Sequence, residues 1–486
     1  MKHSYYLTVD LGASNGRGIV FSYNGSSLVP IEEFRFPNGI VTRNGTDHWD
    51  FAYLLQNVKQ TIAAAAERYP LRSAAVDTWG LDYGLLDKNG ALLDEPVSYR
   101  DSRTVGIPEA VEKHISAREL YEITGIQKLQ GNTLYQLYAQ LLDPAQPLAR
   151  AEQLLMMPDL LRYFLTGERF AEYTISTTSQ MLDIRAGTWS RALLDRLGLP
   201  AELFAPVIRP GKQAFVLHPE LCGGKKLSLV TAASHDTASA VAALPTEDAA
   251  PLYVSSGTWS VLGTELSEPL ICDEGYALNF ANEGGADGSI RYCSSLTGLW
   301  LLQECVRNWR ERRQTCDYAA LDKLAQDAAP FVSLFDPQDP SLQAKCDMPA
   351  AIGALCAANG THVPQAMGEF ARAIYEAIAL NYRRAVDRLE RLTARSYDKL
   401  YVIGGGSRAE LLNQCIANAT GKTVVAGMPE ATAFGNAYAQ LLYDGEVSSL
   451  PDFRGMLAAS QPLRYYTPEQ SAEWEAAYDR FQANCG

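Results

Sequence analysis

The chain has 486 residues, of which 47% are hydrophobic and 20% are charged, a composition typical of a globular protein. This length is too great for one compact core and predicts two domains. The net charge of −14 argues against a nucleic-acid-binding surface, which would need a basic stripe. It does not exclude a nucleotide ligand, because backbone amides and a metal ion can hold phosphate inside an acidic protein.

The sequence shows no sign of export or membrane insertion. No charged and apolar leader precedes the strand-like run that starts at Tyr5, and no run approaches the 18 apolar residues of a membrane span. Nine cysteines lie between Cys222 and Cys485 without a C-x-x-C pair, which favours free thiols in a reducing compartment. We therefore expect a cytoplasmic protein without membrane or nucleic-acid partners.

Strand-like and helical patterns alternate through the first 100 residues. The patterns predict a strand to Asp10, a second strand over Gly18–Tyr23, a third near Leu28–Phe36, a helix near Phe51–Arg68, a buried strand over Ser73–Asp77 and a short one at Leu85-Leu86. Helical patterns dominate from about Glu109 to Leu197.

The second half repeats this alternation. Proline breaks precede a predicted strand over Leu227–Thr231, and Leu244–Asp248 is the predicted crossover into this half. After the crossover, the predicted elements are a helix over Glu369–Ala394, a strand over Lys399–Ile403 and a helix from Arg408 to Ala419. Three glycines, Gly404 to Gly406, stand between that last strand and helix. This order favours a bound nucleotide, because helix N-termini present free amides and a positive dipole end.

A strand, a tight glycine turn and a second strand occur twice, at Gly12–Gly16 and at Ser256–Thr258. Glycine lets the backbone approach a polyphosphate, and amides and hydroxyls of the turn can donate to its oxygens. Two such turns, each opening one half of the chain, indicate a duplicated fold that binds one nucleotide phosphate tail.

Two other motif matches fail on their context. Gly12-Ala13-Ser14-Asn15-Gly16 fits the nucleophile elbow of hydrolases, but that elbow leads into a helix and a strand follows here. Gly421-Lys422-Thr423 resembles the end of a P-loop, but Ile416 stands where the first glycine is needed. Neither a serine hydrolase nor a P-loop enzyme is supported.

Asp236 follows a run of small residues, where a strand end meets a helix start. Its carboxylate could simply cap the helix, or it could act as a general base for a sugar hydroxyl. Asp10 could likewise only end its strand, but a carboxylate beside a phosphate-binding turn is well suited to hold Mg²⁺ through water.

These segments together resemble the FGGY carbohydrate kinases, and within them the rhamnulokinases. Marks at the level of the family are Asp10–Ser14, Ser256–Trp259 and Gly404–Gly406. Sharper marks are Asp77–Asp82, Tyr99–Arg103, Ser234–Val241, Asn282–Gly285 and Gly298–Gln303. The similarity extends from Asp10 to about Gln440.

The resemblance implies a duplicated α/β fold of the actin/hexokinase-like (ribonuclease H-like) type, with two domains around a central cleft, here residues 1–244 and 245–486. It implies ATP and Mg²⁺ as cofactors and a ketose as the substrate. The residues that would contact ATP are Ala13, Ser14, Asn15, Gly16, Arg17, Thr258, Gln303 and Gly405. Those that would contact the sugar are Gly80, His235, Asp236, Thr237 and Ser295.

The implied reaction is phosphorylation of the C1 hydroxyl of L-rhamnulose. Asp236 would accept the proton, and Asp10 and Asp236 would lie near the Mg²⁺. Ser295 stands where rhamnulokinases usually carry an asparagine, so other ketoses such as L-fuculose and L-xylulose remain alternative substrates. A non-catalytic sugar-responsive regulator on the same fold is a separate alternative. Asn15 replaces the usual Ser or Thr of the first turn. The protein is expected to be a monomer or a homodimer.

Overall fold

The structure, a computed structural model, describes residues 3–314 and 317–485. The chain falls into two compact units. Unit 1 is formed by Met1–Ala249, Glu265–Tyr292 and Ala431–Ser460, and unit 2 by Ala250–Thr264, Cys293–Glu430 and Gln461–Gly486. The division into halves at residues 244 and 245 remains a prediction about the duplication, since the units themselves are discontinuous in sequence.

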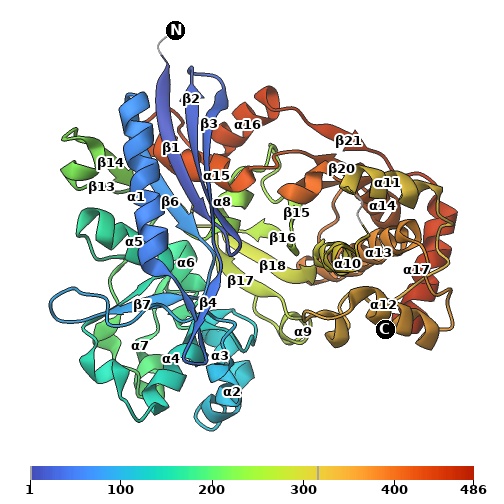
Figure 1. The fold of residues 1–486 in the computed structure, drawn as a ribbon, viewed down its shortest axis with the longest axis horizontal. Helices are drawn as coiled ribbons and strands as arrows, with labels where there is room; N and C mark the ends of the chain where they lie inside the picture. The colour runs from blue at the N-terminus through green and yellow to red at the C-terminus, as the bar shows by residue number, and fades with distance from the viewer. Residues whose placement is uncertain (1–2, 315–316, 486) are drawn as a thin grey trace. The chain divides into compact units, whose positions relative to one another are not determined.

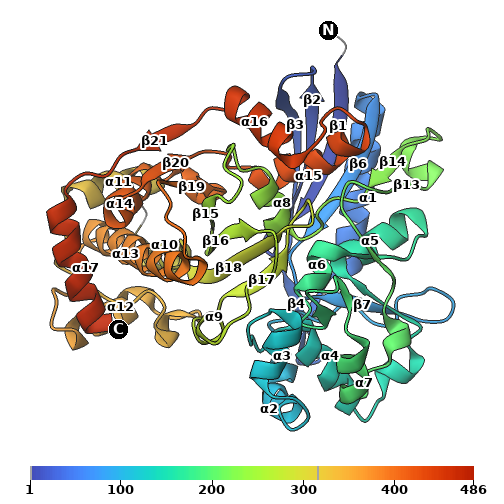
Figure 2. The ribbon, with the colours of Figure 1, turned by 180° about the vertical axis from the view of Figure 1, so that it is seen from behind.

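Unit 1 is built on a six-stranded mixed sheet (Figures 1 and 2). In spatial order its strands are β13 (Ala214–Val216), β14 (Ser228–Val230), β6 (Leu71–Thr78), β1 (Ser4–Leu11), β2 (Asn15–Tyr23) and β3 (Leu28–Pro37). β1 pairs antiparallel with β2 and parallel with β6, which in turn pairs parallel with β14.

Helices cover both faces of this sheet. Helix α1 (Phe51–Arg68) begins at Asp50, whose carboxylate accepts a hydrogen bond from the Tyr53 amide, and it packs its buried apolar face on β1, β2 and β6. Helices α8 (Asp236–Ala242) and α15 (Ala431–Tyr443) pack on β6, α15 also on β1. Side chains alternate along a strand, so Leu7 and Val9 join the core under α1, while Asp10 projects to the other face.

The rest of unit 1 is a mainly helical insertion between β6 and β14. Its helices are α2 (Ile107–Val111), α3 (Ala117–Thr124), α4 (Thr133–Leu142), α5 (Met157–Thr166), α6 (Tyr173–Thr177) and α7 (Arg191–Leu197). Its short strands are β7 (Tyr83–Leu86), β8 (Gln153–Met156), β9 (Ala171–Glu172), β10 (Leu182–Asp183), β11 (Thr188–Trp189) and β12 (Val207–Ile208). Strands β4 (Ile40–Arg43) and β5 (Thr46–Trp49) form a hairpin, and α9 (Asp273–Ala277), β17 (Ala281–Gly284) and α16 (Leu450–Ser460) complete the unit.

Unit 2 contains a second mixed sheet. The strands of this sheet that belong wholly or mainly to unit 2 run in the order β18 (Ile290–Thr297), β16 (Trp259–Leu266), β15 (Leu252–Ser256), β19 (Lys399–Ile403), β20 (Thr423–Ala426) and β21 (Arg464–Tyr466). The helices are α10 (Trp300–Glu311), α11 (Tyr318–Asp327), α12 (Met348–Ala358), α13 (Met367–Thr393), α14 (Glu410–Thr420) and α17 (Ser471–Cys485).

The two sheets repeat one pattern. β15 pairs antiparallel with β16 and parallel with β19, as β1 does with β2 and β6. β19 then pairs parallel with β20, and β20 antiparallel with β21, as β6 does with β14 and β14 with β13. This repetition confirms the predicted duplicated α/β fold.

Most predicted elements are present with close boundaries. The predicted helix over Phe51–Arg68 and strand over Lys399–Ile403 match α1 and β19. The region from Glu109 to Leu197 is less uniform than the predicted helical stretch, because strands β8 to β11 lie between its helices. Strands of two residues carry no readable periodicity.

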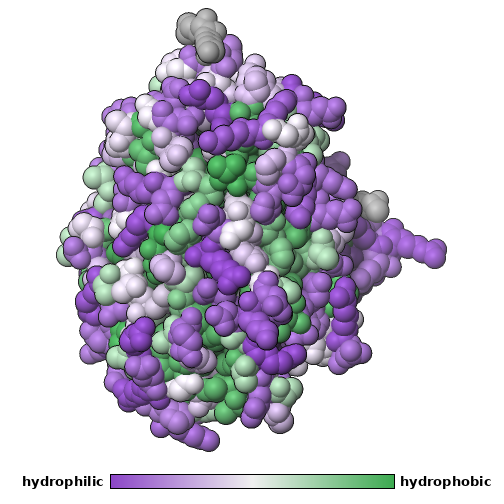
Figure 3. Space-filling model, turned by 90° about the vertical axis from the view of Figure 1, so that its left-hand side faces the viewer, coloured by the Kyte–Doolittle hydropathy of each residue, from purple (hydrophilic) through white to green (hydrophobic). Residues whose placement is uncertain are grey.

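The surface and the cysteines agree with a globular protein. Hydrophilic residues predominate on the face shown in Figure 3, and hydrophobic residues appear in the gaps between them. Within the described residues, none of the helices has the length and apolar character needed to cross a membrane. The described cysteines are free thiols, and most of them are buried.

Candidate active site

Two aspartates stand side by side at the ends of the central strands of unit 1. Asp10 of β1 pairs in register with Asp77 of β6 on one side and with Arg17 of β2 on the other. Arg17 donates from Nε to Asp10 Oδ2 over 2.8 Å, which fixes this carboxylate. The alternation that buries Leu7 and Val9 under α1 thus directs Asp10 to the opposite face.

Asp77 is fully buried and is held from α15. Asn436 Nδ2 donates to Asp77 Oδ2 over 2.5 Å, from a position 359 residues away in sequence. Burial, and after it repulsion by Asp10, raise the pKa of Asp77 well above the ordinary value of a carboxyl group. Asp77 therefore favours its protonated form more strongly than an exposed aspartate does.

The chain after Asp77 turns sharply beside these carboxylates. Thr78 N donates to the carbonyl of Ser234 over 2.9 Å, which joins the turn to the start of α8. A Cβ atom at Gly80 would lie 3.4 Å from His235 Nε2, so the predicted sugar contacts Gly80 and His235 are neighbours. Leu81 has a φ of 79°, in the left-handed region that residues with a Cβ seldom adopt.

Asp82 fixes the aromatic residues behind this turn. Its Oδ2 accepts hydrogen bonds from the indole nitrogens of Trp49 at 2.6 Å and Trp79 at 2.8 Å. Burial raises the pKa of Asp82 to about 6. Trp79 and Tyr83 are both buried, so the structure favours a core role over sugar stacking for these two aromatic residues.

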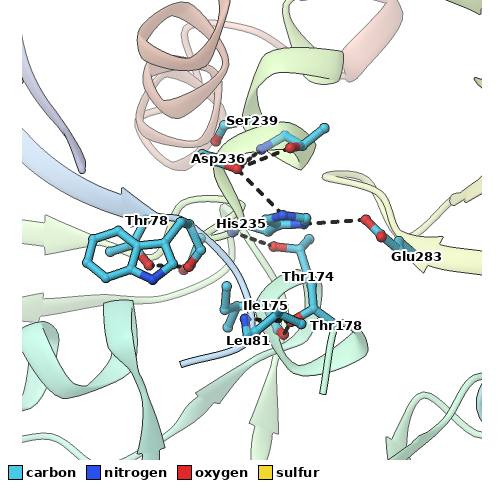
Figure 4. Close-up of polar contacts among 12 residues, drawn as sticks. Thr78, Leu81, Thr174, Ile175, Thr178, His235, Asp236, Ser239 and Glu283 are labelled. Carbon is cyan, nitrogen blue, oxygen red and sulfur yellow. Dashed lines mark hydrogen bonds and ion pairs between the residues drawn. The ribbon is translucent and has the colours of Figure 1, made fainter. Parts of the chain in front are cut away.

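Asp236 is the first residue of α8, as the sequence predicts (Figure 4). Its Oδ1 accepts from the Thr237 amide at 2.6 Å and from Thr237 Oγ1 at 3.1 Å, and its side chain is 28% exposed. No hydrogen bond from a described residue reaches Oδ2, which leaves that oxygen for a ligand. Burial, followed by the charge of Asp10, raises the pKa of Asp236 to about 7.

His235 lies between Asp236 and Glu283 (Figure 4), and Arg291 also contacts its ring. Its Nε2 lies 3.5 Å from Asp236 Oδ1, and its Nδ1 lies 3.5 Å from Glu283 Oε2 on β17. Arg291 Nη2 lies 3.0 Å from the same Nδ1 and donates to Glu283 Oε2 over 2.6 Å. Burial lowers the pKa of His235 to about 4, so the imidazole is neutral at pH 7.

This arrangement assigns the tautomer of His235. A guanidinium can only donate, so Nδ1 must accept from Arg291 and the ring proton must reside on Nε2. That N–H faces Asp236 Oδ1 and the backbone of Gly80. A neutral donor at this position can hold a hydroxyl-bearing ligand next to the Asp236 carboxylate.

Glu172 positions the loop that carries His235 and Asp236. This fully buried carboxylate accepts from Ser234 N at 3.1 Å and from the backbone and hydroxyl of Thr174 at 2.9 and 2.6 Å. Thr174 Oγ1 also accepts from His235 N at 3.1 Å (Figure 4). The N-terminus of α6 is thereby joined to the start of α8.

The first glycine turn follows Asp10 directly. Gly12 N donates to Asn15 O over 2.9 Å, which closes the turn and exposes Ser14 and Asn15 while Gly16 is buried. A Cβ at Gly16 would lie 2.2 Å from the ring of Phe36, so only glycine fits there. The predicted ATP contacts Ala13 to Arg17 are therefore grouped beside the carboxylate of Asp10.

Unit 2 brings together the other predicted nucleotide contacts. Thr258 Oγ1 donates to Gln303 Oε1 over 3.0 Å, and Thr258 O accepts from Trp300 N at 3.0 Å. A Cβ at Gly406 would lie 2.0 Å from Ser256 Oγ, so the glycines after β19 pack on the second turn. Gly405 is exposed with no heavy atom within 4 Å of a built Cβ, and Ser295 is exposed on β18.

The charges in unit 1 are compatible with a magnesium ion. The charge of Asp10 contributes to the raised pKa of Asp236, so a cation beside these carboxylates would offset their repulsion. No set of three metal-ligating side chains is found among residues 3–314 and 317–485. Mg²⁺ retains several waters and needs only one or two carboxylates, so the pair fits it.

Several residues of this cluster are absent from the sequence-based site. Asn436 holds Asp77 across 359 residues of sequence, which no local pattern reveals. Arg291 is fully buried in β18. In the sequence, its role is indicated by a lone arginine within the strand-like run Ile290–Cys293. Glu283 and Asp82 stand within motifs that mark the family resemblance, but their roles depend on contacts outside those motifs.

Comparisons with known proteins show what this architecture belongs to. Residues 5–243 match the N-terminal domain and residues 252–442 the C-terminal domain of the FGGY family of carbohydrate kinases. The chain therefore belongs to the FGGY family of carbohydrate kinases.

Individual relatives are similar over nearly their whole length. The rhamnulokinase of Bacteroides thetaiotaomicron is 40% identical over 100% of both chains, and that of Oceanobacillus iheyensis is 36% identical over 95% of this chain and 97% of its own. Xylulose kinase from Lactobacillus acidophilus has a similar fold, with a TM-score of 0.81 at 15% identity over 99% of this chain and 97% of its own.

Proposed function

We propose that this protein is an ATP-dependent kinase that phosphorylates L-rhamnulose at its C1 hydroxyl, giving L-rhamnulose 1-phosphate. The observation that supports it most is the environment of Asp236, a half-buried carboxylate with one oxygen free of partners among the described residues. The similarity to rhamnulokinases over the full chain length supports the choice of sugar.

In the proposed reaction Asp236 acts as the general base. Its Oδ2 accepts the proton of the C1 hydroxyl as that oxygen attacks the γ-phosphorus of ATP, and the bond from the γ-phosphorus to the bridging oxygen of ADP breaks. The Nε2–H of His235 and the backbone at Gly80 orient the sugar. Because Thr237 donates two hydrogen bonds to Oδ1, the carboxylate keeps one orientation throughout.

The nucleotide is proposed to bind through the residues of both glycine turns, namely Ala13 to Arg17 in unit 1 and Thr258, Gln303 and Gly405 in unit 2. Asp10 and Asp236 are the proposed ligands of Mg²⁺, through water. The ion supplies positive charge that offsets the charge of the phosphate oxygens. Backbone amides and hydroxyls of the turns provide the remaining donors.

The identity of the ketose depends on Ser295. A serine hydroxyl is shorter than the asparagine amide and offers one donor instead of two, which favours a different hydroxyl pattern in the sugar. Another ketose, such as L-fuculose or L-xylulose, is therefore the second candidate. A non-catalytic regulator is disfavoured because Asp236 and its supporting contacts are present. A cytoplasmic location and a monomeric or homodimeric state stay predictions.

The proposed function is tested by measuring ADP release with a panel of ketoses. We expect the highest kcat/KM with L-rhamnulose, and no release above background without sugar. The panel is repeated with Ser295→Asn and, as a control for loss of the hydroxyl alone, with Ser295→Ala. Absence of sugar-dependent ADP release across the panel would exclude the kinase, while preference for another ketose would reassign its substrate.

A further inference from the structure

Unit 1 contains a pocket whose lining includes none of the residues of the candidate active site. Its volume is about 460 Å³, within the range of small-molecule sites. Tyr438 and Leu442 of α15 and Leu450 at the start of α16 provide an apolar wall, and Arg209 and Lys212 provide two cations. A site with two cations on an apolar wall matches an anionic ligand with a compact organic part.

The Arg209 guanidinium is held in place without an anionic partner. It lies 3.6 Å from the ring centroid of Tyr173, which is buried. Its Nη2 would be 2.5 Å from a Cβ at Gly187, and its Nη1 would be 3.9 Å from one at Gly288. This packing limits the rotamers of the side chain and presents its charge in a fixed direction.

Neither cation of the pocket forms an ion pair with the described part of the protein. Within the described part of the chain, Arg209 and Lys212 have no carboxylate oxygen within the 4.0 Å of an ion pair. The acidic residue that lines the pocket, Asp287, accepts from its own loop at Ser289 N over 3.1 Å. Two cations and one carboxylate leave the pocket lining with a net positive charge, in a chain whose net charge is −14.

The N-terminus of α16 does not account for the recognition of an anion. Ser449 Oγ accepts from Asp452 N at 3.3 Å, and Asp452 Oδ2 accepts from Ser448 N at 2.8 Å. These contacts already cap the helix and place a carboxylate there. Recognition of charge must therefore come from Arg209 and Lys212.

Two walls of the pocket belong to elements that also hold the candidate active site. On α15, Tyr438 and Leu442 face the pocket, whereas Asn436 on another face of the same helix donates to Asp77. The turn between β17 and β18 lines the pocket with Gly288, and Glu283 before it lies 3.5 Å from His235 Nδ1. A ligand that shifts either element would alter the positions of Asp77 or His235.

We propose that this pocket binds a small phosphate ester with a compact, partly apolar organic group, and that the bound ester changes the rate of the kinase reaction. Phosphate is favoured over carboxylate because its oxygens and double charge can engage both cations at once. The organic group would lie against Tyr438, Leu442 and Leu450.

Binding is tested with phenyl phosphate as the probe, using isothermal titration calorimetry with saturating ADP present so that the nucleotide site is occupied. Benzoate and phenol serve as the carboxylate and uncharged counterparts. We expect phenyl phosphate to bind, and Arg209→Gln/Lys212→Gln to weaken it by at least about tenfold. Lys88→Gln/Lys226→Gln removes the same charge at exposed positions outside the pocket and should leave the affinity unchanged.

The double variant loses the Arg209 contact with Tyr173 and this loss could impair folding, so Lys212→Gln is also tested alone. The single variant should still weaken binding measurably. Equal affinity for benzoate, equal weakening in the control variant, or no binding of phenyl phosphate would overturn the proposed site. The rate is followed as ADP separated by chromatography, with and without the probe. A change of at least about twofold in kcat or in the sugar KM is expected, and binding without any change would overturn the effector role.

Discussion

At the scale of single residues, Leu81 is the position where the backbone departs most from its preferred conformation near the candidate sugar site. A left-handed φ costs a residue with a Cβ roughly 1–2 kcal/mol, and Leu81 has a φ of 79°. Its carbonyl accepts from Thr133 Oγ1 at 2.6 Å and its amide donates to Thr178 Oγ1 over 3.3 Å, so neighbouring side chains impose the conformation. The strain presents the preceding Gly80 to His235.

This leads to a prediction for a matched pair of variants. Leu81→Gly removes the Cβ that causes the strain, whereas Leu81→Ala keeps it, and both lose the rest of the side chain. The glycine variant should be more stable by about 1 kcal/mol in chemical denaturation, and its sugar KM should rise because the turn is less rigid. Equal stability of the two variants would show that φ at this position stores no strain.

At the scale of elements, α15 determines how the carboxylates of the sheet are held. It crosses α8 so closely that a Cβ at Gly435 would lie 1.6 Å from Ser239 O. On one face of the helix, Asn436 bonds Asp77, and Gln440 bonds Ser73 Oγ at 2.7 Å and Leu7 O at 3.0 Å. A shift of α15 would therefore move both Asp77 and α8, the helix that carries Asp236.

The close crossing of α15 and α8 predicts that a glycine-to-alanine substitution in α15 and one in α16 affect stability in opposite directions. Gly435→Ala forces α15 and α8 apart and should destabilise the protein by about 1–3 kcal/mol, with a lower kcat. Gly455→Ala, in α16 where a Cβ would meet nothing within 4 Å, should be neutral or stabilise by about 0.5–1 kcal/mol. Thermal unfolding of both variants measures the contrast, and a harmless Gly435→Ala would refute the close crossing.

Local patterns predicted the elements well where they are long and amphipathic. Phe51–Arg68 combines apolar residues at helical spacing with a capping aspartate, so its boundaries could be predicted from the sequence. Asp236 could be placed at a helix start because small residues surround it. The partners Asn436 and Arg291 could not be predicted, because their roles depend on pairings between distant segments that leave no periodic signal.

At the scale of the whole molecule, unit 1 contains several buried carboxyl groups. Their burial in the folded state disfavours the charged form. Burial raises the pKa of Glu172 to about 7 and that of Asp159 to about 6. A carboxyl group with a raised pKa in the folded state contributes stability below its unfolded pKa, and that contribution is lost as the pH rises through the folded value. For Glu172 the loss falls between about pH 4.5 and pH 7.

The pH dependence gives a whole-protein prediction. Glu172→Gln cannot ionise, so its melting temperature relative to the wild type should rise between pH 5 and pH 8, even though the amide forms poorer hydrogen bonds with Ser234 and Thr174. Glu168→Gln, at an exposed position nearby, serves as the control and should show a constant difference. Calorimetry at the two pH values measures both, and a constant difference for Glu172→Gln would contradict the assigned cost of ionisation.

The duplicated sheets give each unit the same strand, glycine turn and strand, but the contexts of the two turns differ. The turn of unit 1 follows Asp10, whereas the turn of unit 2 follows Ser256 and packs on the glycines after β19. Only the first copy carries the carboxylates, so the proposed proton transfer depends on residues of unit 1.

The most direct test of this account is the turnover of Asp236→Asn. Asparagine keeps the size of the side chain but cannot accept the hydroxyl proton as a base, so kcat for sugar-dependent ADP release should fall by at least about 10²-fold. The affinity for ATP, measured by calorimetry, should be largely retained. Turnover close to that of the wild type would contradict the role of Asp236 as the proton acceptor.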